Sequence, residues 1–488
     1  MTADEGDLRG GLDRPAVGRE AIEGLPVGVR TALAGAVAGL AGALALSLVD
    51  PDPEPLWLAV GPLYGAALPV LVGRRTTDPG RGLVWGLGTG LLAWAAVVWL
   101  VAGLGVSVGP FTTTGDSFTW SVYLILGLGA PVGLVLGWLG GRRVASERTP
   151  LDLPRALLVG GAAGLVGGWA FGVWMGQEDV FPLIAGLVGS DSALVGRLLH
   201  YLIAATIGVG FGLLFQRDAR GFGSSIAWGM AYGILWWFLG GLTLLALLLG
   251  DPVTWTTAAA SEQVGSLVGH VVYGLLLGLL YSVLDRFWRV LFVESDPLNY
   301  EATGPGIRTL RAMGWGLVAS LVGGLAFGAV MWSTGELEMV AALVGRSSAL
   351  AGFGVHLAVS SIVGMSYGRL FRYEAPTLAA GVAWGAVYGL VWWFVGPLTL
   401  MPVLLGEPLA WSADGLATAL PSLFGHLAYG APTGAAFYLL ERRHRAWERL
   451  DPHVADRERR RRREVGTPAP AVWTVTLGTA FLVVAVLL

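Results

Sequence analysis

The chain has 488 residues, of which 54% are hydrophobic and only 13% are charged, and its formal net charge is −3. Soluble domains carry about 25% charged residues, so this composition indicates a protein embedded in a lipid bilayer rather than dissolved in water. The chain contains no cysteine and no lysine, which excludes disulfides, thiol chemistry, Schiff bases and phosphate-binding loops built on a lysine.

Apolar segments follow one another along the chain after a polar N-terminal tail, residues 1–26. Segments of about 18–25 apolar residues are long enough, as helices, to cross a hydrocarbon layer about 30 Å thick. We therefore expect an all-α, polytopic transmembrane helix bundle of about 13 spans, or 12 if the last one does not insert. The expected spans are residues 27–48, 55–73, 82–104, 120–141, 155–175, 192–215, 222–249, 264–284, 309–332, 348–371, 376–405, 420–440 and 471–488.

The loops between the expected spans alternate in charge. Arginines lie in every second loop, for example in 142–148 and 286–289, whereas the others carry acidic residues such as Asp251 and Glu407. Because arginine-rich loops stay in the cytoplasm, the pattern predicts a cell-membrane protein with a cytoplasmic N-terminus. An Arg-rich segment, 447–470, is expected to lie against anionic lipid head groups, and no nucleic-acid partner is expected.

Two long stretches of the sequence match at a constant offset of 156 residues. Ala227–Phe238 reads AWGMAYGILWWF, and Ala383–Phe394 reads AWGAVYGLVWWF. A weaker copy precedes them and shares their glycines spaced four residues apart, a spacing that lets helices pack closely in lipid. Each copy has an even number of spans, so all copies have the same orientation. The predicted domains are a tail (1–26), a degenerate first four-helix unit (27–143), a second unit (154–290), a third unit (310–446), an Arg-rich linker (447–470) and a C-terminal transmembrane helix (471–488).

Four of the six histidines lie within expected spans. His200 and His356 occupy the second span of the second and third units, and His270 and His426 occupy the fourth. All four fall at a similar depth, in the outer half of the membrane. No acidic residue lies in the middle of a span, which disfavours a proton-coupled carrier of the usual kind. The histidines are therefore the best candidates for a functional site.

The simplest interpretation of the histidines is structural. Each imidazole would donate or accept a hydrogen bond to a neighbouring helix and so hold the bundle together. The candidate partners occur in both the second and the third unit: Tyr232 and Tyr388, Tyr273 and Tyr429, and Ser266 and Ser422.

A second interpretation is a membrane electron carrier with haem b held by two histidines. Gly269 and Gly274 flank His270, and equivalent glycines flank His426, which would leave room for a flat macrocycle. Without a carboxylate or thiolate nearby, a metal site is less favoured.

The third interpretation is a permeation or ligand-binding site, where imidazoles titrate near neutral pH. It would be lined by the four histidines together with residues of the third span of each unit: Tyr232, Trp236 and Trp237, and Tyr388, Trp392 and Trp393.

Short motifs in the third unit resemble the YagU-like inner-membrane proteins, a family of small, functionally uncharacterised four-helix proteins. The motifs are Gly354-Val-His, Leu423-Phe-Gly-His and Glu441-Arg-Arg, and matching positions occur in the second unit. The resemblance implies a tandem fusion of that unit, with His356 and His426 as family-pattern positions. It implies no activity, and Trp392 stands about where that family has another histidine.

Together these patterns favour a non-enzymatic membrane protein that handles a solute or ion, or binds a small molecule, at the level of the four histidines. The alternatives are the haem electron carrier and purely structural histidines. No catalytic residue is predicted.

Overall fold

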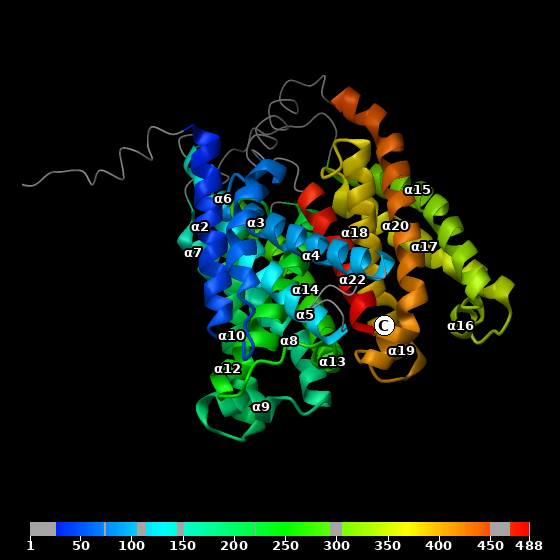
Figure 1. The fold of residues 1–488 in the computed structure, drawn as a ribbon. Helices are drawn as coiled ribbons and strands as arrows, with labels where there is room; N and C mark the ends of the chain where they lie inside the picture. The colour runs from blue at the N-terminus through cyan, green and yellow to red at the C-terminus, as the bar shows by residue number, and fades with distance from the viewer. Residues whose placement is uncertain are drawn as a thin grey trace, which may run out of the picture.

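The computed structural model describes residues 26–72, 75–104, 114–143, 151–219, 221–292, 305–448 and 469–487 (Figure 1). Within these ranges every regular element is a helix, and there is no strand. This confirms the predicted all-α, polytopic class. The N-terminal tail 1–26 and the Arg-rich linker 447–470 fall almost entirely outside the described residues.

The residues of the predicted first unit and the beginning of the predicted second unit form long helices joined by turns and short helical segments. The elements are α2 (Val27–Ser47), α3 (Leu56–Val72), α4 (Pro79–Leu104), α5 (Thr114–Val122), η3 (Tyr123–Gly129), α6 (Ala130–Arg143), α7 (Leu153–Arg155), η5 (Ala156–Gly160), α8 (Gly161–Gln177), α9 (Phe181–Ala185), η6 (Gly186–Val188) and α10 (Ala193–Phe215). The remaining helices follow the same pattern. They are α11 (Phe222–Trp236), η7 (Trp237–Leu244), α12 (Leu245–Leu249), α13 (Thr257–Glu262), α14 (Val264–Phe292), α15 (Pro305–Thr334), α16 (Leu337–Ala342), α17 (Ala349–Phe371), α18 (Leu378–Val395), η8 (Gly396–Leu400), α19 (Met401–Leu405), α20 (Ala413–Glu448) and α22 (Ala469–Leu487).

Ten helical segments among the described residues are long and apolar enough to cross a membrane. The three other expected spans, 55–73, 420–440 and 471–488, correspond to the shorter helices Leu56–Val72 and Val472–Leu487 and to part of α20. A count of thirteen spans therefore stays a prediction, while the multi-pass character of the protein is clear.

The third and fourth helices of each unit cross at glycines. The crossings are at Gly86 and Gly129, Gly229 and Gly274, and Gly385 and Gly430. A Cβ atom added at Gly385 would lie 2.1 Å from the carbonyl oxygen of Gly430, so only glycine allows this approach. Lipid chains are as apolar as the helices, so close packing rather than hydrophobic association holds such pairs together.

π-Helical turns interrupt the third helix of both the second and the third unit. They are η7, which follows α11, and η8, which follows α18. In η8, Pro397 has no N–H group and cannot bond the carbonyl four residues earlier, whereas η7 widens without a proline. π-Turns are rare and often occur beside functional sites.

The C-terminal helix α22 lies inside the bundle (Figure 1). It packs mainly against α4 of the first unit and α18 of the third, with smaller contacts to α11, α13 and α20. Of residues Val472–Leu487, only Leu477 is exposed. A helix that is apolar on every side and buried on nearly every side is a core element. It connects the first and third units.

Candidate functional site

His200 and His356 connect two helices of their own units. Nε2 of His200, on α10, donates a hydrogen bond of 2.9 Å to the carbonyl oxygen of Gly168 on α8. Nε2 of His356, on α17, donates to the carbonyl oxygen of Gly324 on α15, also at 2.9 Å. Because a carbonyl only accepts, Nε2 carries the proton in each neutral imidazole, and Nδ1 is an unprotonated acceptor. Both side chains are buried, and both bonds hold neighbouring helices together.

His270 and His426 use their other ring nitrogen, and they bond within their own helix. Nδ1 of His270 donates to the carbonyl oxygen of Ser266 at 2.8 Å, one turn earlier on α14. Nδ1 of His426 donates to the carbonyl oxygen of Ser422 at 2.8 Å on α20. Nε2 is then the unprotonated acceptor, and it has no hydrogen-bond donor among the described residues. Both side chains are only partly buried. These two imidazoles therefore do not join helices.

One phenylalanine ring lies against both histidines of each unit. The Phe171 ring centroid lies 5.7 Å from that of His200 and 4.8 Å from that of His270. The Phe327 ring lies 5.1 Å from His356 and 4.6 Å from His426 in the same way. Each histidine therefore contacts an aromatic ring, and the two histidines of a unit share the same phenylalanine.

The residues present do not fit a haem held by the two histidines of one unit. The space beside Gly269 is taken, because a Cβ atom there would lie 2.0 Å from the Phe171 ring, and Gly425 stands in the same relation to Phe327. Gly274 is used by a helix crossing. The described residues also contain no group of three or more His, Cys, Asp or Glu side chains suited to a metal ion.

The predicted tyrosine partners bond elsewhere. The hydroxyl groups of Tyr273 and Tyr429 donate to the carbonyl oxygens of Ala204 and Ser360, at 2.7 and 2.9 Å. These bonds also join the fourth helix to the second. Tyr388 donates to the carbonyl oxygen of Val363 at 3.0 Å.

Tyr232 packs its ring against aromatic side chains and, like Tyr388, bonds no histidine. The histidines instead bond backbone carbonyls. Of the candidate partners, Ser266 and Ser422 do contact histidines, chiefly through their backbone oxygens.

The paired tryptophans of the third helices divide into two roles. Nε1 of Trp237 donates to the carbonyl oxygen of Gln263 at 3.1 Å, and Nε1 of Trp393 donates to that of Ala419 at 2.9 Å. Both of these rings are fully buried, so they tie the third helix to the start of the fourth. The rings of Trp236 and Trp392 are partly exposed, and their Nε1 atoms lie near the hydroxyl groups of Tyr232 and Tyr388 without a well-aligned hydrogen bond among the described residues. They are therefore better placed to receive a ligand than Trp237 and Trp393.

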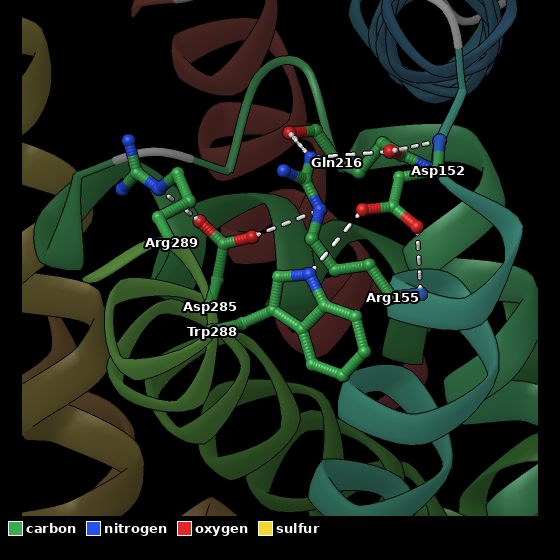
Figure 2. Close-up of polar contacts among 6 residues, drawn as sticks. All are labelled: Asp152, Arg155, Gln216, Asp285, Trp288 and Arg289. Atoms are coloured by element: carbon green, nitrogen blue, oxygen red, sulfur yellow. Dashed lines mark hydrogen bonds and ion pairs between the residues drawn. The ribbon is translucent and has the colours of Figure 1, made fainter. Parts of the chain in front are cut away.

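A second polar cluster, which the sequence analysis did not single out, lies at the opposite ends of these helices. The carboxylate of Asp285 on α14 forms ion pairs with Nε of Arg155 at 3.2 Å and with Nε of Arg289 at 3.0 Å. Figure 2 shows the aspartate between the two arginines, with Gln216 bonding Arg155 from the turn after α10. In the third unit, Arg311 pairs with Glu441 at 3.2 Å.

The two ion pairs lie 156 residues apart in the sequence. Residue 155 corresponds to 311, and residue 285 corresponds to 441. The sequence therefore contained a signal for these ion pairs, because opposite charges recur at matching positions of the first and fourth helices. Their position at the helix ends and their pairing with each other indicate a structural role, because paired charges at that depth hold the two helices together.

Replacing Asp285 with alanine is expected to lower the free energy of unfolding by about 3–5 kcal/mol, because the buried Arg155 guanidinium loses its main partner. Chemical denaturation in detergent micelles, followed by tryptophan fluorescence, measures the loss. Asp251→Ala, at an exposed acidic position, is the control and should change little. Equal losses in the two variants would show that Asp285 does not stabilise the bundle.

Fold and side-chain arrangement together define a helical, multi-pass membrane protein with two histidine pairs. No protein-family model matches this chain, and no curated protein or solved structure matches it. The function must therefore be inferred from the side chains themselves.

Proposed function

We propose that the protein is a non-enzymatic membrane protein that handles a small hydrogen-bond-donating solute or a cation, with His270 and His426 as its ligand-binding residues. The observation that carries the proposal is the Nε2 atom of each: an unprotonated acceptor on a partly exposed ring, with no donor among the described residues. An acceptor of this kind is open to a hydrogen bond from a ligand that carries a donor.

The hydrogen bonds support different roles for the two histidine pairs, one structural and one in ligand binding. His200 and His356 join helices, which is the role that the structural interpretation assigned to all four. His270 and His426 bond only within their own helices and touch the neighbouring helix through the rings of Phe171 and Phe327, so no hydrogen bond between helices accounts for an imidazole at these positions.

The surroundings of His426 also support a binding role. A methyl group added at Gly396, the first residue of the π-helical η8, would lie 3.7 Å from Nε2 of His426. The acceptor nitrogen thus faces a widened turn of the third helix, where backbone groups are less regularly paired. In the second unit, η7 follows α11 at the corresponding place.

The repeat architecture and topology are part of the same proposal. Hydrogen bonds recur at an offset of 156 residues: His200 with His356, His270 with His426, Trp237 with Trp393, Tyr273 with Tyr429, and Trp255 with Trp411. They support two equivalent units related by tandem duplication, as the YagU-like resemblance implies. We further propose a cytoplasmic N-terminus in the cell membrane and binding of anionic lipids by the linker 447–470.

Proteoliposomes test the histidine site with three probes: protons, Zn²⁺ and glycerol. The protein is expected to accelerate the entry of at least one probe over empty liposomes. The double variant His270→Gln/His426→Gln should reduce that acceleration by roughly 5–10-fold per lost hydrogen bond of about 1–1.5 kcal/mol. The matched double variant His200→Gln/His356→Gln should mainly lower the thermal unfolding midpoint.

Two outcomes would count against the proposal. One is entry of all three probes at the rate of empty liposomes, without any change in the histidine ¹⁵N signals on adding them. The other is an unchanged rate in the His270/His426 variant.

A further inference from the structure

Two carboxylates and one guanidinium meet where the first unit joins the second. Nε and Nη2 of Arg81, at the start of α4, donate to Oδ1 of Asp218 at 2.7 and 2.6 Å. Nε of Arg81 also lies 3.2 Å from Oδ2 of Asp78, whose Oδ1 accepts from the backbone N–H of Arg81 at 3.0 Å. Asp218 lies in the turn between α10 and α11. The cluster thus connects α4 to the second unit.

Among the described residues, no donor bonds the second oxygen of Asp218. The side chain of Asp218 is fully buried, and its Oδ2 atom makes no hydrogen bond as an acceptor. The carboxyl group of Asp78 lies within its hydrogen-bonding reach. If both were ionised, the neighbouring carboxylates of Asp78 and Asp218 would repel each other in a place almost without water. A proton on Oδ2 removes that repulsion and converts the unsatisfied acceptor into a donor.

We propose that Asp218 and Asp78 form a proton-binding site, in which Asp218 carries the proton at neutral pH and donates it from Oδ2 to the carboxylate of Asp78. Arg81 then balances the single remaining negative charge. The ligand of this site is the proton, and binding it keeps α4 attached to the turn after α10. The site is separate from the histidines and does not depend on the function proposed for them.

The charges around Asp218 agree with this assignment. Burial is the largest effect and raises its pKa well above the usual value; the charge of Asp78 raises it further, while Arg81 lowers it. Arg217, the preceding residue in the same turn, is also charged. An acid whose pKa is higher in the folded than in the unfolded protein binds more protons when folded. Its contribution to stability therefore falls as the pH rises from the unfolded pKa towards the folded one.

Infrared difference spectroscopy of the whole protein in lipid tests the proposal directly. A protonated carboxyl group has a C=O stretching band distinct from that of a carboxylate. The wild type at neutral pH should show this band, and it should disappear at alkaline pH. Asp218→Asn should remove the band, while Asp251→Asn, at an exposed aspartate, should leave it unchanged. A spectrum that is the same in wild type and Asp218→Asn overturns the proposal.

Thermal unfolding provides the second measurement. The asparagine amide keeps both functions of the protonated acid, since its oxygen accepts from Arg81 and its N–H donates to Asp78. Asp218→Asn should therefore match the wild type in unfolding midpoint at acidic pH, near the unfolded pKa of the aspartate, and exceed it by a growing margin at neutral and alkaline pH. Asp218→Ala should be less stable than Asp218→Asn at every pH. An ordinary ion pair with Arg81 predicts the opposite, a loss of stability in Asp218→Asn at neutral pH. That result would overturn the proposal even if a variant yields too little protein for spectroscopy.

Discussion

Replacing Gly385 with leucine is expected to prevent the third unit from assembling. At this position α18 crosses α20, and a Cβ atom would lie only 2.1 Å from the carbonyl oxygen of Gly430. Backbone cannot yield as a flexible side chain does, so the two helices would have to separate. Overpacking in a well-packed core costs about 1–3 kcal/mol and sometimes more. We expect a loss of about 3 kcal/mol or more in the free energy of unfolding.

The chain offers a matched control in Gly354, a helical glycine of α17 with nothing within 4 Å of its added Cβ atom. Gly354→Leu should leave stability unchanged or raise it slightly, because leucine has a helix propensity better than that of glycine by roughly 1 kcal/mol. Denaturation of both variants in the same detergent gives the comparison. If they are equally stable, helix crossing at glycine does not determine the packing of this bundle.

Deleting the C-terminal helix, residues 469–488, is expected to separate the first unit from the third. α22 packs against α4 and against α18, and all of its residues from Val472 to Leu487 except Leu477 are buried or partly buried. Its removal exposes the faces of both helices. The truncated protein should show a much lower thermal unfolding midpoint and faster proteolysis of its loops than the full chain.

Point substitutions show whether burial is the reason. Leu482 is fully buried, whereas Leu477 is 39% exposed. Leu482→Ala should cost about 2–5 kcal/mol, as for other buried leucines, and Leu477→Ala should cost much less. Similar losses at both positions, or a truncated chain as stable as the full one, would contradict a central role for α22.

Much of the fold was predictable because the bilayer limits the choices. A span must be helical and about 20 residues long, so hydropathy alone locates helices such as α10 and α17 close to their observed ends. The short helices α9 and α16 fall in connections between expected spans. The π-turns η7 and η8 were not expected, because helix widening depends on a few backbone hydrogen bonds and leaves no hydropathy signal.

The candidate site was predictable only in part. Sequence pattern identified four histidines worth testing, since ionisable groups are rare within spans. It could not separate His200 from His270, because the difference lies in which ring nitrogen bonds which carbonyl. It also allowed room for a haem beside Gly269, where the structure places the Phe171 ring. The Arg155–Asp285 pair was not predicted, because both residues lie at helix ends, where charged residues are common.

The sequence by itself determined that this is a helical membrane protein with recurring segments and histidines within its spans. Length, apolar composition and the offset of 156 residues can be read from the sequence. In a bilayer, apolar segments of this length form helices. Only the tertiary structure decided what each polar side chain contacts. Every residue carries a backbone carbonyl, so a bond such as that from His200 to Gly168 depends on the spatial position of two helices, which no residue type encodes. For the same reason, the cluster of Asp78, Arg81 and Asp218 could not be predicted, because it forms only when segments distant in the sequence come together.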